Sequence, residues 1–291
     1  MKQYKELLQK ILDEGTERGD RTGVGTISIF DARFEHDMRE GFPALTTKKL
    51  FWRGVVGELL WFLSGSSNVD TLREYTYGLL GRQKTIWDDN YNNQAKGLGY
   101  RGGELGPVYG KQWRAFGIYE QTENGGIKLV GNSIDQITEL LKEASTNPES
   151  RRLLVSAWNP LVIDISALPP CHWAFELYID NGFLDFKWHQ RSVDVFLGLS
   201  YNIASYALLQ SILAKLLNLQ PRKLVGDLTN VHIYKNHIDQ VKEQLTREPY
   251  PLPSLVMPEF ITLDDLKFKE ATDFSLSNYE HHPTIKAEMA I

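Results

Sequence analysis

A predicted β-hairpin in the second half of the chain constrains the fold more than any other feature. Residues 174–179 and 183–188 alternate apolar and polar side chains, which is the pattern of strands that bury one face. The intervening Asp180-Asn181-Gly182 favours a tight hairpin turn. In an antiparallel hairpin, residues equally far from the turn face each other. The pattern therefore predicts that Arg191, which follows the second strand, lies close to Cys171, which precedes the first.

Cys171 is the only cysteine in the 291 residues, so it cannot form an intramolecular disulfide. A lone cysteine is often a small buried apolar residue, and this interpretation stands beside the alternative that it is a nucleophile. Pro169 and Pro170 stiffen the chain before it, and the titratable ring of His172 follows it. A guanidinium held close to the thiol would lower its pKa. Arg191 is the candidate for that role.

Composition limits the classes of ligand. With 42% hydrophobic and 11% aromatic residues, the chain is expected to fold into a globular protein. Its net charge of −5 provides no overall positive field for duplex nucleic acid, so we expect no nucleic acid partner, and an anionic ligand would need local arginines. No Cys/His cluster has zinc spacing, and we expect no metal. No apolar run has the length of a membrane span, and the N-terminus starts no signal peptide, so we expect no membrane contact and a cytoplasmic protein.

Hydrophobic periodicity predicts one α/β (α+β) domain over residues 1–291, on a mainly antiparallel or mixed sheet with flanking helices. Helices are predicted over residues 2–14, 51–63, 133–146, 197–219 and 237–245. Besides the hairpin, strands are predicted over residues 27–34, 153–158 and 224–234. A polar stretch at about 64–130 is expected to be an irregular small subdomain, and within it residues 117–131 are expected to form a loop.

Several polar residues could carry chemistry. Glu58 lies in the strongly apolar helical stretch 51–63, and an inward-facing carboxyl there would have the raised pKa of a general acid or base. The alternative is a glutamate on the polar face of an amphipathic helix. Asn202, near the start of a long apolar helix, is either a capping residue or an amide that reads a ligand. His232 and Tyr234 are two residues apart on a predicted strand and share one face.

Three arginines are candidates for binding an anion. Arg21 lies in a polar loop with glycines, either as a solvated cation or as a clamp that closes on an anion. Arg151 and Arg152 form an adjacent pair before the strand 153–158, where they are either an anion site or two ordinary surface residues. Residues 105–114 gather Tyr, Trp, Lys and Arg around two glycines, a composition suited to the wall of a ligand pocket.

Taken together in chain order, these motifs point to one family. Along essentially its whole length, the chain resembles the folate-dependent thymidylate synthases. Any one motif is a weak signal, whereas all of them in family order form a strong one. The segments that carry the resemblance are residues 20–23, 57–63, 85–88, 105–114, 150–152, 168–172, 190–198, 202–206 and 232–237.

The resemblance implies a fold on a large, mostly antiparallel twisted sheet, and an obligate homodimer whose sheets pack face to face. It implies methylation of dUMP with 5,10-methylenetetrahydrofolate as donor of both the carbon and the hydride, giving dTMP and dihydrofolate. Cys171 would be the nucleophile that adds to C6 of the uracil ring, after which C5 attacks the folate-derived carbon. Glu58 would manage protons at O4 and at the folate nitrogen, and Tyr109 would take part in removing the C5 proton.

The resemblance also assigns residues to three sets. The catalytic residues would be Cys171, Glu58, Tyr109, Arg191, Asn202 and Asp194. The nucleotide would be bound by Arg21, His172, Gln190, Arg191, Ser192, Asp194, Asn202, His232 and Tyr234, with Arg151 and Arg152 reaching over from the partner subunit. The folate co-substrate would be bound by Lys48, Glu58, Ile86, Trp87, Asp194, Gly198, Ala290 and Ile291.

Within the nucleotide set, the arginines and Ser192 would hold the phosphate. Asn202 would read the O4/N3 edge of the base, and His232 and Tyr234 would contact the sugar hydroxyl. The C-terminal Ala290-Ile291 would close over the complex and exclude water.

The chain departs from the usual family pattern at three places. These are His189 where Tyr is common, Ser200-Tyr201 in place of Pro-Phe, and Leu228-Thr229-Asn230-Val231 in place of Gly-Gly-Asp-Thr or Gly-Gly-Asn-Thr. A second hypothesis is therefore a deoxyuridylate or other pyrimidine-nucleotide hydroxymethylase, in which water rather than hydride completes the reaction. Asn202 disfavours the deoxycytidylate version, because an acidic residue would complement cytosine better. A third is a catalytically silent nucleotide- or RNA-binding protein, against which Cys171 and Glu58 argue.

Overall fold

The predicted hairpin lies in the middle of the central sheet. Strand β6 (His172–Asp180) pairs antiparallel with β7 (Phe183–Asp194), and His172 stands opposite Gln190. The turn Asn181-Gly182 has φ angles of 48° and 81°. Two successive left-handed residues are what a two-residue hairpin turn of the favoured twist requires. The hairpin prediction is confirmed.

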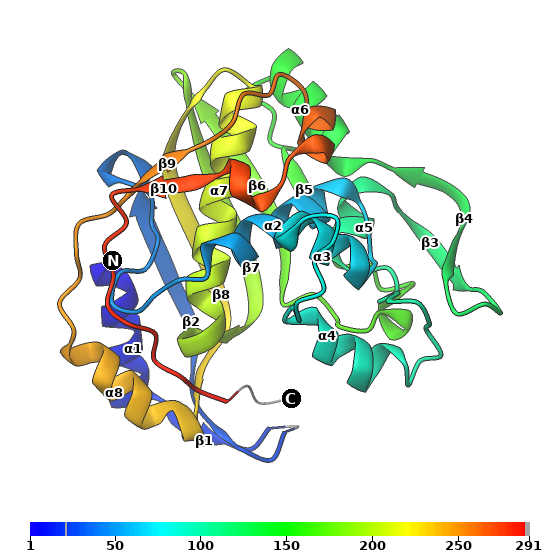
Figure 1. The fold of residues 1–291 in the computed structure, drawn as a ribbon. Helices are drawn as coiled ribbons and strands as arrows, with labels where there is room; N and C mark the ends of the chain where they lie inside the picture. The colour runs from blue at the N-terminus through cyan, green and yellow to red at the C-terminus, as the bar shows by residue number, and fades with distance from the viewer. Residues whose placement is uncertain (21, 289–291) are drawn as a thin grey trace.

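The central sheet has six strands in the order β1-β2-β8-β7-β6-β5 (Figure 1). The structure is a computed structural model that describes residues 1–20 and 22–288. The pairings are antiparallel except that of β7 with β8, which is parallel. The prediction of an α+β fold on a mostly antiparallel sheet is confirmed. The other strands of this sheet are β1 (Thr16–Arg18), β2 (Thr26–Asp37), β5 (Leu154–Ser156) and β8 (Gln220–Tyr234).

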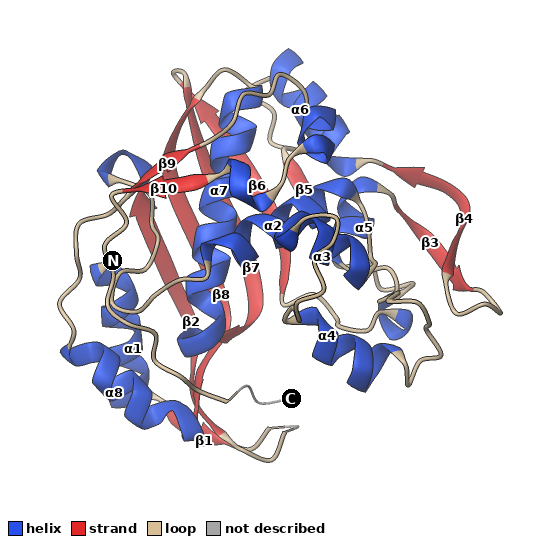
Figure 2. Cartoon of the chain, in the orientation of Figure 1, coloured by secondary structure: helices blue, strands red, loops and turns tan. Residues whose placement is uncertain are grey.

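Helix α7 (Ser200–Leu216) provides the crossover that the parallel pair needs, and it lies across one face of the sheet (Figures 1 and 2). Helix α2 (Trp52–Ser64) packs on its other side. A helix enclosed on both sides must be apolar all round, as the sequence of α7 is. The ring of Tyr206 on α7 stacks on Trp188 of β7, with centroids 5.3 Å apart.

The segment Val195–Leu216 has the length and hydropathy of a membrane span, although we expected no such run. It joins a π-helix, Val195–Leu199, to α7. Within its apolar window, 72% is buried inside the protein. The central helix of a folded domain meets the same criteria of length and composition, and the burial identifies Val195–Leu216 as such a core helix.

The other elements flank the sheet. Helix α1 (Lys2–Glu14) contacts β2 and α8 (Ile238–Thr246). The remaining helices are α3 (Val69–Tyr77), α4 (Trp87–Asn90), α5 (Tyr109–Arg114) and α6 (Gln136–Thr146). Two small sheets pair β3 (Phe116–Gln121) with β4 (Ile127–Ile134), and β9 (Ser254–Val256) with β10 (Ser275–Ser277).

The expectation of an irregular segment at about 64–130 is wrong in part. Helix α3 forms there, with the side chain of Asn68 accepting a hydrogen bond from the backbone N–H of Asp70 as an N-cap. Residues 117–131, expected to be a loop, belong largely to the β3–β4 hairpin. That hairpin exposes apolar side chains such as Ile118, at 45%. Apolar and polar residues alternate along a strand only when one of its faces is buried. Because this hairpin is largely exposed, its sequence lacks that alternation.

Candidate active site

Cys171 and Arg191 lie side by side at one end of the β6–β7 hairpin. The backbone N–H of Arg191 donates to the carbonyl of Cys171 at 2.9 Å. The guanidinium donates from Nε to the carbonyl of Pro170 and from Nη2 to that of Pro169, both at 3.0 Å. Its Cζ atom lies 5.3 Å from the ring centroid of Trp158. These contacts fix the guanidinium against the loop that carries the cysteine, and the predicted proximity is confirmed.

The surroundings of Cys171 act on its thiol in opposite directions. The residue is half-buried, and burial raises the pKa because the thiolate loses hydration. The charge of Arg191 and a hydrogen bond with Tyr109 lower the pKa, but by less. Arg191 therefore acts as expected from the sequence, while burial outweighs it. Arg191 and Tyr109 are the groups that favour the reactive thiolate here.

A column of rings lies beside the cysteine. The hydroxyl of Tyr109, on α5, accepts a hydrogen bond from the backbone N–H of Cys171 at 2.7 Å. The Tyr109 ring stacks on His172, with centroids 4.4 Å apart. Nδ1 of His172 lies 2.8 Å from the hydroxyl of Tyr206. Burial lowers the pKa of His172 to about 3, so its ring is neutral at physiological pH and is held as a structural partner of the two tyrosines.

Glu58 joins this column through a tryptophan. Nε1 of Trp87 donates to Oε1 of Glu58 at 2.6 Å, and the Trp87 ring meets Tyr109 edge-on at 5.9 Å. Glu58 is half-buried, and burial raises the pKa of its carboxyl to about 7, with the Trp87 hydrogen bond acting weakly in the opposite direction. The predicted burial and raised pKa are both present. A carboxyl that titrates near neutral pH can both give and take a proton.

Asn202 is held in one orientation by its neighbours on β7. Nε1 of Trp188 donates to Oε1 of Gln190 at 3.2 Å, and Nε2 of Gln190 donates to Oδ1 of Asn202 at 3.1 Å. Asn202 lies in the first turn of α7 and does not act as its N-cap. Tyr206 had no role in the sequence-based assignment. Tyr206 follows Asn202 by four residues, so both lie on one side of a helix. This spacing is the sequence signal that could have placed Tyr206 near the site.

Asp194 and Lys48 meet at the π-helix that precedes α7. Oδ1 of Asp194 accepts hydrogen bonds from the backbone N–H groups of Phe196 and Leu197, both at 3.1 Å. Nζ of Lys48 donates to the carbonyl of Phe196 and lies 3.9 Å from the centroid of its ring. Burial lowers the pKa of Lys48 to about 8, although the charge of Asp194 acts to raise it. A buried amine of this kind is suited to an incoming anion.

His232 and Tyr234 lie on β8, beside the end of β7. His232 stands opposite Asp194 in the parallel pairing, and its ring meets that of Tyr234 edge-on at 5.3 Å. Nδ1 of His232 lies 3.1 Å from Oδ1 of Asn230. Asn230 belongs to the unusual Leu228–Val231 segment and stands opposite Ser192. Asn230 is the one residue of this segment that matches the Gly-Gly-Asn-Thr pattern, and its side chain orients His232.

Arg151 and Arg152 lie apart from the other predicted residues. Both are exposed, in the turn before β5. β5 pairs antiparallel with β6, and Leu154 stands opposite Glu176. The arginines therefore lie toward the turn end of the hairpin, on the order of 20 Å from Cys171 at ~3.3 Å per strand residue.

The structure leaves the roles of five further predicted residues as predictions. Arg21, Ala290 and Ile291 lie outside the described residues. The Ile86 side chain is 63% exposed and offers apolar surface just before α4. A Cβ added at Gly198 would make only ordinary contacts, so protein packing does not itself require glycine there.

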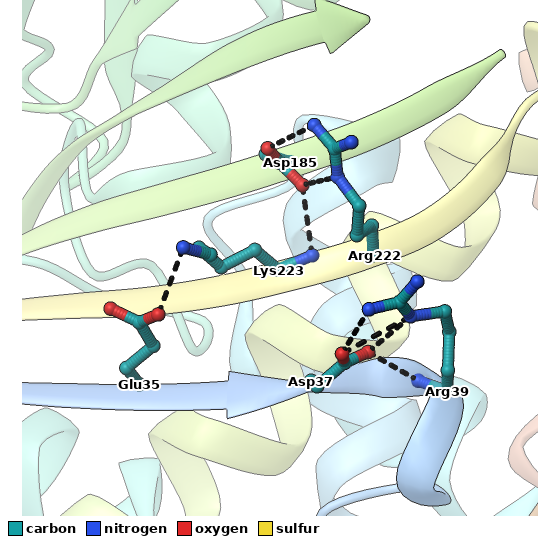
Figure 3. Close-up of a pocket in the computed structure, with 6 residues that line it drawn as sticks. All are labelled: Glu35, Asp37, Arg39, Asp185, Arg222 and Lys223. Carbon is teal, nitrogen blue, oxygen red and sulfur yellow. Dashed lines mark hydrogen bonds and ion pairs between the residues drawn. The ribbon is translucent and has the colours of Figure 1, made fainter. Parts of the chain in front are cut away.

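A separate hollow of about 460 Å³ is lined by six charged residues (Figure 3). One of them, Asp185, closely follows the hairpin turn, so the hollow lies at the end of the sheet remote from Cys171. Its lining is charged, but the charges pair with one another across β2, β7 and β8. Such pairs leave no free guanidinium or ammonium for a phosphate, so this hollow is not the nucleotide site. The pairs are Arg222 with Asp185, Lys223 with Glu35, and Arg39 with Asp37.

Comparison with known proteins decides the family. The model of the thymidylate synthase family matches residues 2–291. The chain belongs to this family. It is 53% identical over 293 residues to a probable thymidylate synthase of Escherichia phage T5, and 48% identical over 301 residues to the thymidylate synthase of Enterobacteria phage T4, with 100% of both chains covered in each case. The crystal structure of thymidylate synthase from T4 phage matches with a TM-score of 0.88 at 48% identity, again over 100% of both chains.

The predicted resemblance is thus confirmed, and with it the reaction class. Members of the thymidylate synthase family are methyltransferases that convert dUMP to dTMP and use methylenetetrahydrofolate. The chain is an enzyme of this kind. The hydroxymethylase alternative is not favoured, because both of these full-length relatives bear the name thymidylate synthase.

Proposed function

We propose that the enzyme methylates dUMP through a covalent bond between Cys171 and C6 of the uracil ring, and that a hydride from the folate completes the methyl group. One observation carries this proposal. The single thiol of the chain is half-buried between Arg191 and Tyr109, the two groups that lower its pKa. The products would be dTMP and dihydrofolate.

In the proposed sequence, Sγ of Cys171 bonds to C6, and the electron pair of the C5=C6 double bond moves toward C5 and the O4 carbonyl. C5 then bonds to the one-carbon unit as the bond from that carbon to one folate nitrogen breaks. Loss of the C5 proton releases the carbon from the second folate nitrogen and leaves an exocyclic methylene group and tetrahydrofolate. Tetrahydrofolate gives a hydride to the methylene carbon and becomes dihydrofolate, and the C5=C6 double bond re-forms as the bond to Sγ breaks. The Tyr109 hydroxyl accepts a hydrogen bond from the backbone N–H of Cys171 at 2.7 Å, and this closeness to the proposed nucleophile supports a part for Tyr109 in removal of the C5 proton.

Base recognition is assigned to Asn202. Its Oδ1 accepts one hydrogen bond from Gln190 and has a second lone pair for the N3–H of uracil, while its Nδ2 can donate to O4. Cytosine presents the opposite pattern, an acceptor at N3 and a donor at N4. Glu58 is assigned the proton transfers at O4 and at the folate nitrogen, because a carboxyl with a pKa of about 7 can exchange protons in both directions.

The folate co-substrate is assigned to the region between Trp87 and Lys48. Ile86 offers exposed apolar surface for the rings. The ammonium of Lys48 is nearly desolvated and, among the described residues, has no carboxylate within ion-pair distance. It therefore suits the carboxylates of a folate tail. Asp194, Gly198, and the C-terminal residues Ala290-Ile291 complete this assignment.

The phosphate is assigned to Arg191, Ser192 and Arg21, together with Arg151 and Arg152 of a second subunit. Two features support a homodimer. The two exposed arginines lie too far from Cys171 to serve the site of their own chain. The strands next to them, β5 and β6, also expose apolar side chains, with Leu154 at 49% and Tyr178 at 65%, and a homodimer that packs its sheets face to face would bury them.

Subunit mixing tests the shared site. Arg152→Ala and Cys171→Ser should each abolish most activity when they are homodimers. Mixed in equal amounts under conditions that allow exchange, half of the dimers become hybrids with one intact site, so activity should recover to about a quarter of the wild-type value. Arg39→Ala, a substitution in the remote charged hollow, is the control. Mixed with Arg152→Ala in equal amounts, it should give only the activity that the Arg39→Ala enzyme contributes by itself. Failure of the Cys171 and Arg152 variants to complement each other would contradict the shared site.

Product analysis tests the hydride step. With dUMP and 5,10-methylenetetrahydrofolate, we expect dihydrofolate and dTMP to form in equal amounts, measured by absorbance and by nucleotide mass. Formation of a hydroxymethyl nucleotide together with tetrahydrofolate would show that water completes the reaction and would overturn the proposal. A cytoplasmic location stays a prediction.

A further inference from the structure

The amide of Gln190 is fixed in one orientation by two groups of opposite kind. The indole N–H of Trp188 can only donate, and its Nε1 lies 3.2 Å from Oε1 of Gln190. The carbonyl of Ser192 can only accept, and it lies 3.0 Å from Nε2 of Gln190. A Gln190 amide turned over would place N–H against N–H at Trp188 and oxygen against oxygen at Ser192. Because Gln190 is buried, water does not relieve either conflict.

The orientation of Gln190 determines that of Asn202. Nε2 of Gln190 donates to Oδ1 of Asn202 at 3.1 Å. If the Asn202 amide turned over, its Nδ2 would face Nε2 of Gln190, and two donors would meet without an acceptor. A cytosine base needs that turned amide, since its N3 accepts a hydrogen bond and its N4 donates one. A uracil base needs the Asn202 amide as it lies.

Trp188 is itself held by packing on both sides. Its side chain is fully buried, and its ring stacks on that of Tyr206 with centroids 5.3 Å apart and 11° between the planes. The ring of Phe34, on β2, lies 6.0 Å from it. Gly226 on β8 stands opposite Trp188, and a Cβ added there would collide with the indole ring. These contacts hold the indole N–H toward Gln190.

We propose that Trp188 is a positioning residue that sets the choice of base, because through Gln190 it holds Asn202 in the orientation that accepts uracil and rejects cytosine. The inference deepens the proposed function and rests on it for the contact of Asn202 with the base. Trp188 is fully buried, so it offers no surface to the nucleotide and acts through Gln190 alone. Its N–H raises the free energy of the turned Gln190 amide, which is the form that would let Asn202 meet cytosine.

The test measures equilibrium binding of dUMP and of dCMP to the enzyme by titration calorimetry. Trp188→Phe removes the donor and keeps an aromatic ring against Tyr206. One of the two conflicts that oppose a turned Gln190 is then gone. We therefore expect the ratio of the Kd for dCMP to the Kd for dUMP to fall on the order of fivefold, with the Kd for dUMP within about threefold of wild type. A general loss of packing would weaken both nucleotides alike and leave this ratio unchanged.

Two further variants keep the test decisive. Should Trp188→Phe not fold, Trp188→Met makes the same test, because a flexible apolar side chain fills much of the space and also has no donor. Asn202→Ala removes the amide through which Trp188 acts, so in that background Trp188→Phe should not change the ratio. A ratio that falls equally in both backgrounds, or a wild-type ratio in Trp188→Phe, would overturn the role of Trp188. A ratio that Asn202→Ala by itself leaves unchanged would instead count against the proposed base recognition.

Trp61→Phe is the matched control. Trp61 is also a fully buried tryptophan, but its Nε1 has no hydrogen-bond partner among the described residues. The same replacement there removes an indole ring and an N–H that orients no other side chain. The ratio of the two Kd values should therefore stay at the wild-type value. An equal fall of the ratio in Trp61→Phe and Trp188→Phe would overturn the proposal, because it would trace the effect to the lost ring rather than to the N–H.

Discussion

Replacing Cys171 with serine is expected to reduce dTMP formation by more than about 10³-fold, because a serine hydroxyl is far less nucleophilic than a thiolate at neutral pH. The fold should survive the change, since the backbone contacts of Cys171 with Arg191 and Tyr109 do not involve the sulfur. Steady-state assays of dihydrofolate formation measure the loss. Equilibrium binding of dUMP, which we expect to stay within about tenfold of wild type, shows that the nucleotide site remains.

Two measurements make this result specific. The variant should contain no titratable thiol, because the chain has no other cysteine. Wild-type enzyme incubated with dUMP and a folate analogue that cannot give a hydride should gain at least the mass of the nucleotide. The serine variant should not. Unchanged turnover by Cys171→Ser would rule out the covalent mechanism.

Replacing Glu58 with glutamine should lower kcat by about 10²-fold or more, because the amide cannot transfer protons. The hydrogen bond from Trp87 can persist, since glutamine keeps an acceptor oxygen at the same place. The wild-type pH profile of kcat/KM should contain an apparent pKa near 7 that the glutamine variant lacks. A variant with full activity, or with an unchanged pH profile, would remove Glu58 from the proton transfers.

The same substitution should stabilise the protein at high pH. The folded pKa of Glu58 is about 7, above its ordinary value of 4.5. Between these values the folded state holds more protons than the unfolded state, so the free energy of unfolding falls as pH rises through this window. Glutamine has no such ionisation. At pH 8 we therefore expect Glu58→Gln to be about 1–3 kcal/mol more stable than wild type in urea unfolding, and at pH 4 nearly equal to it.

Glu74→Gln provides the control for both effects. Glu74 is an exposed residue of α3, so the same chemical change there removes a solvated charge. Neither kcat nor the pH dependence of stability should change. Equal stability of wild type and Glu58→Gln at pH 8 would mean that the Glu58 carboxyl is well hydrated in solution.

Much of the site was predictable wherever one local pattern sufficed. Alternating side chains around Asp180-Asn181-Gly182 determine the hairpin and its register, and this alone brings Arg191 to Cys171. The apolar neighbours of Glu58 in α2 likewise determine that its carboxyl is poorly hydrated. Local patterns failed for β3 and β4, because both strands are largely exposed and no buried face imposes a period on their sequence.

The sequence by itself therefore determined the family and the hairpin, and it pointed to Cys171 as the candidate nucleophile, because each depends on residues whose order in the chain carries the information. The tertiary structure decided how those groups are tuned. Burial from several elements outweighs Arg191 at the thiol of Cys171 and keeps His172 neutral. Desolvation depends on everything packed around a group, and its contributors are spread over distant parts of the chain, so no local pattern reveals its size.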